Sequence, residues 1–464
     1  MNVNLKQRID EMRDEIIKST KEIISKKSVK HSPVANMPFG EDIHKCFTYT
    51  LDLCKALGFE TKNIDNYAGH AEFGSGEEVV GVLVHLDVVP EGDNWTYPPY
   101  GGEIHDGKIY GRGTIDDKGP AIAALYAMKA IKDSGVKLNK KIRIILGLDE
   151  ESSWESLKYY LAREKAPDVA FTPDADFPAI HGEKGILAFD LVKTFADKVS
   201  DEGIRILSIK GGNRSNMVPD YCEVQLMSNN SLKSKLEAYV KSNDVKLEIL
   251  EVDDRITIKS YGVSAHSSMP EHGQNAISQL ILFLNTLDLE PGDISDFIKL
   301  YSEKIGMEYH GESIGCGFND KPSGKLIFNV GIIDLSEDRV KVTVNIRYPV
   351  TLTDEVVYKG IENNLKNSGV TIVSHEHSAP IYLPKDHELI QKLMKVYREF
   401  TGDDSEPIVI GGGTYARAME NAVAFGPLFP GQPELAHQKD EYISIENLIK
   451  ITKIYANALY ELAK

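Results

Sequence analysis

The feature that most restricts the fold is a nearly continuous apolar run, VVGVLV, at residues 79–84, which leads directly into His85-Leu86-Asp87. A run of this length, rich in β-branched residues, is typical of a strand buried on both faces of a largely parallel sheet. It also places a histidine and a carboxylate at the carboxyl end of that strand, where open α/β sheets bind their ligands.

The elements after this strand alternate between helix and strand. Residues 152–164 read as a helix that opens with a capping-box pattern at Ser152 and Glu155. The other expected elements are a helix at 119–133 and strands at 141–149 and 168–172. This alternation predicts an α/β domain with a mixed, mostly parallel sheet flanked by helices.

A different residue pattern begins near residue 184. Expected strands such as ILAFDLV alternate apolar and polar residues, which suits an antiparallel sheet with one open face. One pattern, strand, strand, helix, strand, occurs at 203–252 and again at 325–376. After Pro384 the alternation of strand and helix returns, with a strand in EPIVIGGG, a helix, a strand in NAVAFGP and a final helix. We therefore expect one domain formed by 1–183 and 383–464, interrupted by an inserted α+β domain, 184–382, with two ferredoxin-like halves.

Composition limits the partners. The chain has 464 residues, more than one hydrophobic core usually serves, and a formal net charge of -17, which opposes binding to nucleic acid or anionic lipid. The N-terminal segment alternates charge with apolar residues as an amphipathic surface helix does, and we see neither a signal peptide nor a membrane anchor. Four scattered cysteines fit a reducing compartment, so we expect a cytoplasmic protein without nucleic acid or membrane partners.

Acidic and imidazole side chains gather at the ends of the expected strands and in the loops after them. Singly, each group has an ordinary explanation, because a histidine at a strand end more often forms a structural hydrogen bond and acidic runs usually face solvent. Together they indicate a ligand site at one edge of the sheet. The groups are His85 with Asp87, Asp116-Asp117, Asp149-Glu150-Glu151, Asp174 and His437.

A pair of divalent cations needs neutral imidazoles, several carboxylates, one shared oxygen ligand and an open position for water. The sequence can supply His85 and Asp174 to one cation and Glu151 and His437 to the other, with Asp116 bridging them. The carboxylates and one hydroxide would balance the cations, so the centre could stay buried without a large Born penalty. Zinc is the default metal for such mixed ligands, and manganese or cobalt would accept them too.

Two further carboxylates suit supporting roles. Asp87 lies two positions after His85, on the same strand face, and could accept the second N–H of the imidazole. Glu150 and Glu151 are adjacent and cannot point the same way from an extended segment. A division of roles follows, in which Glu151 binds metal and Glu150 faces the water as a general base.

Sequence strings across nearly the whole chain resemble the di-zinc peptidase family that contains aminoacylase, glutamate-releasing carboxypeptidases and desuccinylases, and most of all its PepV-type dipeptidases. In order, the strings are HLDVVPEG, YGRGTIDDKGP, LDEESSW, PDADFP, SAHSSMP, NIRYP, GGGTYARA and LAHQKDE. The resemblance implies the ligand assignment above, Glu150 as the catalytic glutamate, a cis peptide between Asp116 and Asp117, and a catalytic domain carrying an inserted lid.

The resemblance also implies roles for residues of the lid. His266 would stabilise the oxyanion of the tetrahedral intermediate, and Arg347 would hold the free carboxylate of the substrate. A turn histidine and a surface salt bridge are the ordinary alternatives. Asn216 is a further candidate for contact with substrate, although an asparagine in such a turn often serves the backbone alone.

The glycine run before Thr414 lacks the lysine and the spacing of a P-loop. We interpret it as a strand-to-helix turn, in which exposed N–H groups near Gly412 and Thr414 could face the substrate carboxylate at a helix start. A plain tight turn is the alternative.

These features predict a metal-dependent dipeptidase, in which a metal-activated water attacks the amide bond of a small peptide. An N-acyl amino acid deacylase or desuccinylase would need the same metals and base, and a non-catalytic peptide- or metal-binding protein would have no evident need of Glu150. The duplicated insert could supply both halves of a lid from one chain, so we expect a monomer rather than a homodimer.

Overall fold

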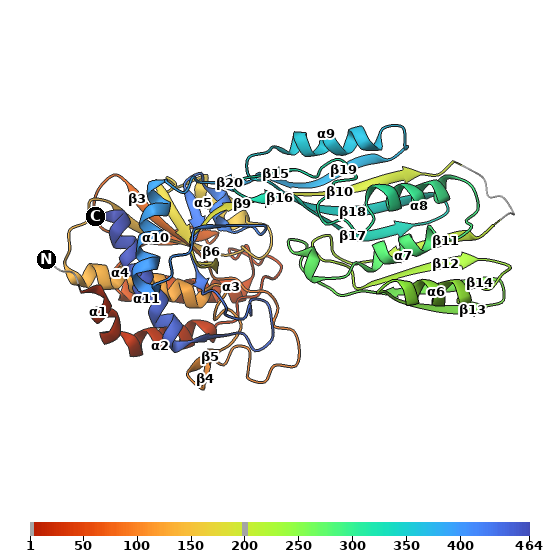
Figure 1. Ribbon diagram of the computed structural model, residues 1–464. Coiled ribbons are helices and arrows are strands. Elements are labelled where there is room, and N and C mark those ends of the chain that lie inside the picture. The colour runs from red at the N-terminus through yellow and green to blue at the C-terminus, as the bar shows by residue number, and fades with distance from the viewer. Residues whose placement is uncertain (1–3, 197–202) are drawn as a thin grey trace. The chain divides into compact units, whose positions relative to one another are not determined.

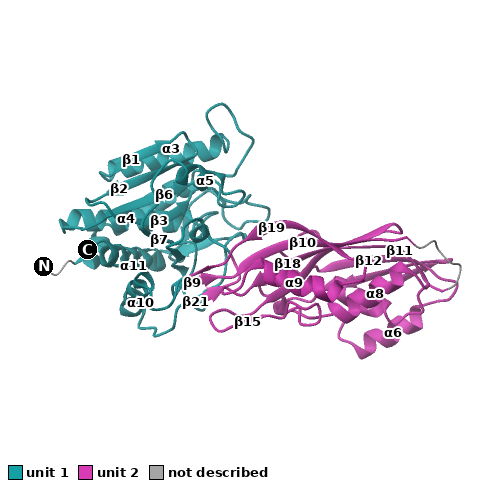
Figure 2. Ribbon diagram, turned by 90° about the horizontal axis from the view of Figure 1, so that it is seen from above, with its two compact units in different colours: residues 1–181, 383–408, 413–464 teal, residues 182–382, 409–412 magenta. Residues whose placement is uncertain are grey.

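The computed structural model describes residues 4–196 and 203–464, and its chain divides into two compact units (Figures 1 and 2). Unit 1 consists of Met1–His181, Leu383–Ile408 and Gly413–Lys464, and unit 2 consists of Gly182–Tyr382 and Val409–Gly412. Among the residues that the structure describes, no helix combines the length and apolar character that crossing a membrane requires.

Unit 1 is built on a mixed sheet, as the sequence predicts. Parallel pairing is found among the four central strands, β6, β3, β7 and β22, and antiparallel pairing flanks them. The strand order is β1 (Glu60–Ile64), β2 (Ala68–Phe73), β6 (Lys141–Gly147), β3 (Val79–His85), β7 (Val169–Thr172), β22 (Ala422–Ala424) and β9 (Ile180–Glu183). Every residue of β3 is buried, and His85 is its last residue.

Helices enclose this sheet. The most deeply buried is α4, which contacts α1, α2 and α11 as well as β3 and β6, so it is apolar nearly all round. The helices are α1 (Leu5–Glu11), α2 (Arg13–Ile24), α3 (Glu41–Ala56), α4 (Lys118–Ser134), α5 (Glu155–Leu161), α10 (Glu388–Thr401) and α11 (Ile445–Ala463). Short strands complete the unit: β4 (Glu103–His105), β5 (Lys108–Tyr110) and β24 (Tyr442–Ser444) form one sheet, and β8 (Ala175–Asp176) pairs with β23 (Pro427–Leu428).

Two local expectations were wrong. The N-terminal segment is amphipathic as expected, with Ile9 and Ile16 buried, but it forms two helices separated at Met12 and not one. The predicted capping box at Ser152 does not form. Helix α5 begins at Glu155, and the buried carboxylate of Asp149 accepts the N–H groups of Glu155 and Ser156 in its place.

Unit 2 contains an eight-stranded antiparallel sheet in the order β13-β14-β12-β11-β17-β18-β10-β19. Helices from both halves pack on one face of it and bury alternate strand residues such as Leu187 and Phe189. The strands are β10 (Gly185–Thr194), β11 (Arg205–Gly211), β12 (Tyr221–Met227), β13 (Lys246–Val252), β14 (Arg255–Tyr261), β17 (Ile327–Leu335), β18 (Arg339–Tyr348) and β19 (Thr371–Ser378), and the helices are α6 (Lys233–Ser242), α7 (Ala276–Leu284), α8 (Asp293–Lys304) and α9 (Asp354–Leu365).

The sheet order confirms the predicted duplication. In each half, a strand-strand-helix-strand segment, β11-β12-α6-β13 or β17-β18-α9-β19, leaves a gap before its last strand, and a fourth strand, β14 or β10, fills that gap. This is the order of a ferredoxin-like sheet. The halves join where β11 pairs with β17. Minor elements of the unit are η1 (Pro270–His272), β15 (Asn319–Asp320), β16 (Gly324–Lys325) and β20 (Ile381–Tyr382).

Two short segments differ from the expected division of the chain, and the first is residues 182–183, which group with unit 2 and not with the first domain. Residues 409–412 were expected to belong with the C-terminal part of the first domain, but they group with unit 2. They follow or belong to β21 (Ile408–Ile410), where the carbonyl of Ile410 accepts the N–H of Lys184 at 2.9 Å.

Unit 1 carries a buried histidine that links its stability to pH. His70 on β2 is 6% exposed, and its Nδ1 lies 2.7 Å from the hydroxyl of Tyr160. Burial, and then the positive charge of Arg143, lower the pKa of His70 to about 4. The unfolded chain binds this proton near pH 6.5, so stability is fully present above that pH and is lost as the pH falls toward 4.

In the parent protein, the unfolding free energy should fall by up to about 3 kcal/mol between roughly pH 6.5 and 4 because His70 titrates. We predict that this fall is absent in His70→Asn, which keeps an acceptor for Tyr160. Urea unfolding of the variant and the parent across this range measures the difference. The exposed His272 of unit 2 provides a control, His272→Asn. An equal pH dependence in all three proteins would contradict the assignment.

Candidate metal centre

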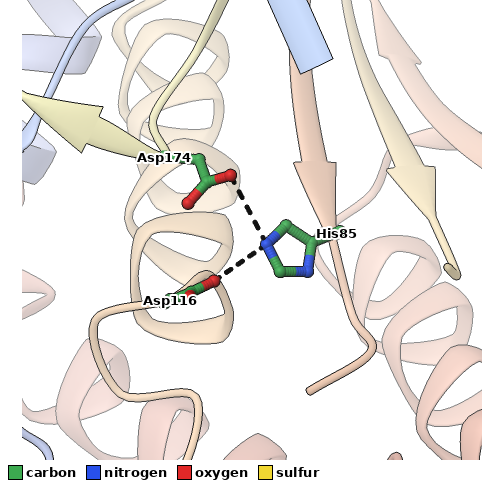
Figure 3. A group of neighbouring side chains, drawn as sticks. All are labelled: His85, Asp116 and Asp174. Atoms are coloured by element: carbon green, nitrogen blue, oxygen red, sulfur yellow. Dashed lines mark ion pairs between the residues drawn. The ribbon is translucent and has the colours of Figure 1, made fainter. Parts of the chain in front are cut away.

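The five predicted ligands come from distant parts of the chain and lie in two groups within unit 1. His85 ends β3, Asp116 lies just before α4, Glu151 follows β6, Asp174 follows β7, and His437 precedes β24. One group contains His85, Asp116 and Asp174, shown in Figure 3, and the other contains Asp116, Glu151 and His437. The structure thus brings all five side chains together, with Asp116 common to both groups.

Asp116 gives one carboxylate oxygen to each group. His85 Nε2 lies 3.0 Å from Asp116 Oδ1 and 3.6 Å from Asp174 Oδ2 (Figure 3). His437 Nε2 lies 3.0 Å from Asp116 Oδ2 and 3.0 Å from Glu151 Oε1. This is the arrangement of a bridging carboxylate between two cations. The peptide bond from Asp116 to Asp117 is cis, as the resemblance implied.

The orientation of His85 fits a cation. Its Nδ1 lies 3.1 Å from the main-chain oxygen of Asp87, so in the neutral ring Nδ1 carries the proton and Nε2 has a lone pair. That lone pair faces the carboxylates of Asp116 and Asp174, an arrangement that repels unless a positive charge lies between them. Imidazole nitrogen with carboxylate oxygen is a donor set suited to zinc and related divalent ions.

The ionisation of the group shows the same need for positive charge. Burial lowers the pKa of His85, but the carboxylates of Asp116, Asp174 and Asp87 outweigh burial and raise it well above its ordinary value. Burial and the charge of Asp116 raise the pKa of Asp174 to about 6, and the same two causes raise the pKa of Glu151. Without cations, His85, Asp174 and Glu151 therefore hold their protons more tightly than the same groups do in water.

Asp87 contacts both His85 and the loop after β6. Its main-chain oxygen, not its carboxylate, accepts the imidazole N–H of His85, and the carboxylate lies 3.5 Å from Nδ1. The two carboxylate oxygens accept the backbone N–H groups of Glu150 and Glu151, each at 3.1 Å. Asp87 therefore holds the loop that carries the predicted general base and a predicted ligand, because that loop offers two N–H donors within reach.

The predicted base, Glu150, lies close enough to the predicted ligands for their charges to shift its pKa. Burial and then the negative charge of Asp174 raise the pKa of Glu150 well above its ordinary value, and Glu151 and Asp116 add to this.

The sequence did not reveal a buried ion pair that joins the segments carrying Asp116 and His437. Arg112 donates to Glu441 at 2.8 Å, and both side chains are almost fully buried. Glu441 also accepts the N–H of Ile115 at 2.9 Å, next to Asp116, while Arg112 donates to the main-chain oxygen of His437 at 3.2 Å. The signal was present in the sequence, because both charged residues lie inside the quoted strings YGRGTIDDKGP and LAHQKDE.

A second missed residue is Tyr415, which is buried beneath the centre with its ring edge-on to His85, 6.1 Å between centroids. The end of β6 must carry glycine here, since a Cβ at Gly147 would lie 2.5 Å from the tyrosine ring. The helix expected after the glycine run is only a 3-10 turn, η2 (Tyr415–Ala418), in which Thr414 caps the N–H of Ala416. So short a turn has little dipole to offer an anion. Gly412 belongs to unit 2 and Thr414 to unit 1.

The candidate substrate-binding residues of unit 2 also lie together. Met217 and His266 form a β-bridge, and the main-chain oxygen of Asn216 accepts the N–H of Ser267 at 2.9 Å. Burial and the positive charge of Arg347 lower the pKa of His266. The loops of His266 and Asn216 therefore lie beside β18, which carries Arg347.

The tautomer of His266 follows from its neighbour. The backbone N–H of Ser268 donates to His266 Nδ1 at 3.3 Å, and the Ser268 hydroxyl lies 2.7 Å from the same nitrogen. A neutral imidazole bonded in this way carries its proton on Nε2. His266 thus presents a neutral N–H donor.

Comparison with known proteins agrees with this geometry. The model of "Peptidase family M20/M25/M40" matches residues 81–461. The chain belongs to this family. The resemblance stated from the sequence strings is thereby confirmed, and the chain is assigned to the metal-dependent peptidases, whose divalent ions the residues above fit.

Curated relatives of this M20 peptidase align over almost its full length. "Putative dipeptidase YtjP" of Bacillus subtilis is 39% identical over 457 residues, 97% of this chain and 98% of that protein. A putative dipeptidase of Staphylococcus saprophyticus is 37% identical over 469 residues, 98% of this chain and 99% of that protein.

Solved structures share the fold at low identity. Human carnosine dipeptidase 1 has a TM-score of 0.58 at 17% identity, covering 99% of this chain and 98% of that one. The aminoacylhistidine dipeptidase of Vibrio alginolyticus has a TM-score of 0.60 at 15% identity, with 97% and 96% covered. These likenesses confirm the predicted α/β fold class with an inserted domain.

The shared position of Asp116 predicts a graded loss of metal. Asp174→Ala is expected to lower bound metal from about two ions per chain to about one, and His437→Ala should do the same at the other position. Asp116→Ala should weaken both. Inductively coupled plasma mass spectrometry after dialysis gives the stoichiometry, with the exposed Asp93→Asn as a control that retains both ions. Equal metal content in all four variants would contradict a shared carboxylate.

Proposed function

We propose that this M20 peptidase is a metal-dependent dipeptidase, with unit 1 as its catalytic domain and unit 2 as its lid domain. The observation that carries the proposal is Asp116, whose two oxygens face two histidine-containing groups at 3.0 Å each, with Glu150 beside them. The relatives named putative dipeptidases support the substrate class.

In this proposal His85, Asp116 and Asp174 hold one divalent ion, and Asp116, Glu151 and His437 hold the other. The ions would act as a Lewis acid and lower the pKa of a bound water. Glu150 accepts a proton from the attacking water and delivers it to the leaving amine of the cleaved bond. Asp87 keeps Glu150 and Glu151 in place through their backbone N–H groups.

The lid residues bind the substrate in this scheme. His266, with its proton on Nε2, donates to the oxyanion of the tetrahedral intermediate. Arg347 pairs with the free carboxylate of the dipeptide, a task for which a planar guanidinium is well shaped. Asn216, Gly412 and Thr414 remain candidates for further substrate contacts.

We further propose zinc as the metal, with manganese or cobalt as substitutes that the same oxygen-rich ligands accept. A cytoplasmic location is supported by the four cysteines, all of which are free and buried. A monomeric enzyme is supported by the duplicated sheet of unit 2, in which β17 of one half already covers the β11 edge of the other.

The base is tested by Glu150→Gln, which keeps the shape of the side chain but cannot accept the proton. We expect kcat to fall by about 10² to 10⁴-fold while both metal ions stay bound. Glu155→Gln, an exposed change in the same segment, is the matched control and should leave kcat unchanged. If Glu150→Gln turns over at the parental rate, the mechanism is wrong.

The substrate class is tested by offering the metal-loaded protein a panel of dipeptides beside N-acetyl and N-succinyl amino acids. Each kcat/KM is measured by release of the free amino acid. We expect dipeptides to be cleaved at least about tenfold better, a preference worth about 1.4 kcal/mol in transition-state binding. Cleavage of the acylated compounds alone would identify a deacylase or desuccinylase instead.

A further inference from the structure

Two buried asparagines of unit 2 lie where a sheet would ordinarily meet solvent. Asn329 on β17 and Asn345 on β18 are directly paired in register and are 3% and 2% exposed. Their neighbours along the strands, such as Val330 and Val344, point into the helix-covered core. The asparagines therefore point to the opposite face, because side chains alternate along a strand.

Loops from the other half of the sheet cover this face. Asn345 Oδ1 accepts the hydroxyl of Ser267 at 3.0 Å, and Ser267 is fully buried. Asn329 Nδ2 donates to the main-chain oxygen of Met217 at 2.9 Å and to that of Ser215 at 3.4 Å. Each asparagine of the second half is thus bonded to a loop of the first half.

The backbones approach closely at the same place. A Cβ at Gly331, next to this pair on β17, would lie 2.5 Å from the main-chain oxygen of Ser215 and 2.6 Å from that of Arg214. Any larger residue would lift the loop from the strand. A bulge interrupts the register between Val330 and Ile332, at the position of this glycine.

The two covering loops also bind one another, and they carry the candidate substrate-binding residues Asn216 and His266. Val218 N–H donates to the oxygen of Ala265 at 2.8 Å, beside the bridge between Met217 and His266. Ser267 further accepts from the guanidinium of Arg347 at 3.4 Å. A single hydroxyl therefore contacts β18 twice, through Asn345 and Arg347.

We propose that Asn329 and Asn345 are positioning residues, which dock the loops of the first half onto the second so that His266, Asn216 and Arg347 form one preorganised substrate-binding surface. The role given to this surface rests on the proposed function. The docking itself does not.

The chemistry of the contacts explains why asparagine suits both positions. A carboxamide supplies an acceptor for the Ser267 hydroxyl and donors for two main-chain oxygens without bringing a charge next to Arg347. An apolar residue at either position would leave buried polar atoms without partners, which costs about 1–3 kcal/mol each. The loops would then move, and a displacement of about 1 Å at a catalytic donor costs on the order of 10²-fold in rate.

Docking is tested first without any substrate. Hydrogen exchange by mass spectrometry on the full chain is compared for the parent, Asn329→Ala, Asn345→Ala and Ser267→Ala. We expect faster exchange confined to residues 212–220 and 262–270. Thr343→Val is the matched control, since Thr343 lies on the same face of β18 but bonds to Asp190 at 2.6 Å and not to either loop.

Kinetics on the metal-loaded proteins supply the second readout. The three docking variants should lose about 10 to 10²-fold in kcat/KM for dipeptides with metal content unchanged, and Thr343→Val should lose none. Asn345→Ala and Ser267→Ala combined should lose no more than the worse single variant, because both remove the same hydrogen bond between Ser267 and Asn345. Parental exchange in the loops of all three variants, or an equal loss in Thr343→Val, overturns the proposal. If no dipeptide is cleaved at all, the proposed function fails while the exchange result still decides the docking.

Discussion

The contact on which the structure depends most is that of one carboxylate with two imidazoles. Asp116 can reach both His85 and His437 only because the loop before α4 crosses the carboxyl end of β3 at the centre of the sheet. Several buried carboxylates surround it, and they would repel one another without compensating positive charge. The carboxylates of the catalytic domain therefore leave an excess of buried negative charge that divalent cations can balance.

Three further carboxylates hold the backbone segments that carry the predicted metal ligands. Asp117 accepts the N–H of His85, Asp87 accepts those of Glu150 and Glu151, and Glu441 accepts that of Ile115 beside Asp116. Each accepts a hydrogen bond from the backbone of a segment that carries a predicted ligand. Charged acceptors form strong hydrogen bonds to N–H groups, so these contacts hold the backbone of the segments that carry the predicted ligands.

Much of the fold could be predicted from short-range patterns. The apolar run of β3 and the repeated strand-strand-helix-strand segments of unit 2 lie in contiguous sequence, and each predicted ligand lies in a short string at or after the end of an expected strand. The errors arose where a contact is formed by a residue outside the motif that predicted it. Asp149 replaces Ser152 as the cap of α5 because its carboxylate is the stronger acceptor, and the pairing of Arg112 with Glu441 or of Asn345 with Ser267 joins segments that only the tertiary structure brings together.

The fusion of two sheet halves in unit 2 has an evolutionary and a practical consequence. An interface between two identical copies obliges every residue to serve both sides of the symmetry axis. Here the halves lie on one chain, so Asn329 and Asn345 serve one side alone, while the first half remains free to specialise its loops. Covalent linkage also fixes the effective concentration of one half about the other, which makes the junction insensitive to dilution.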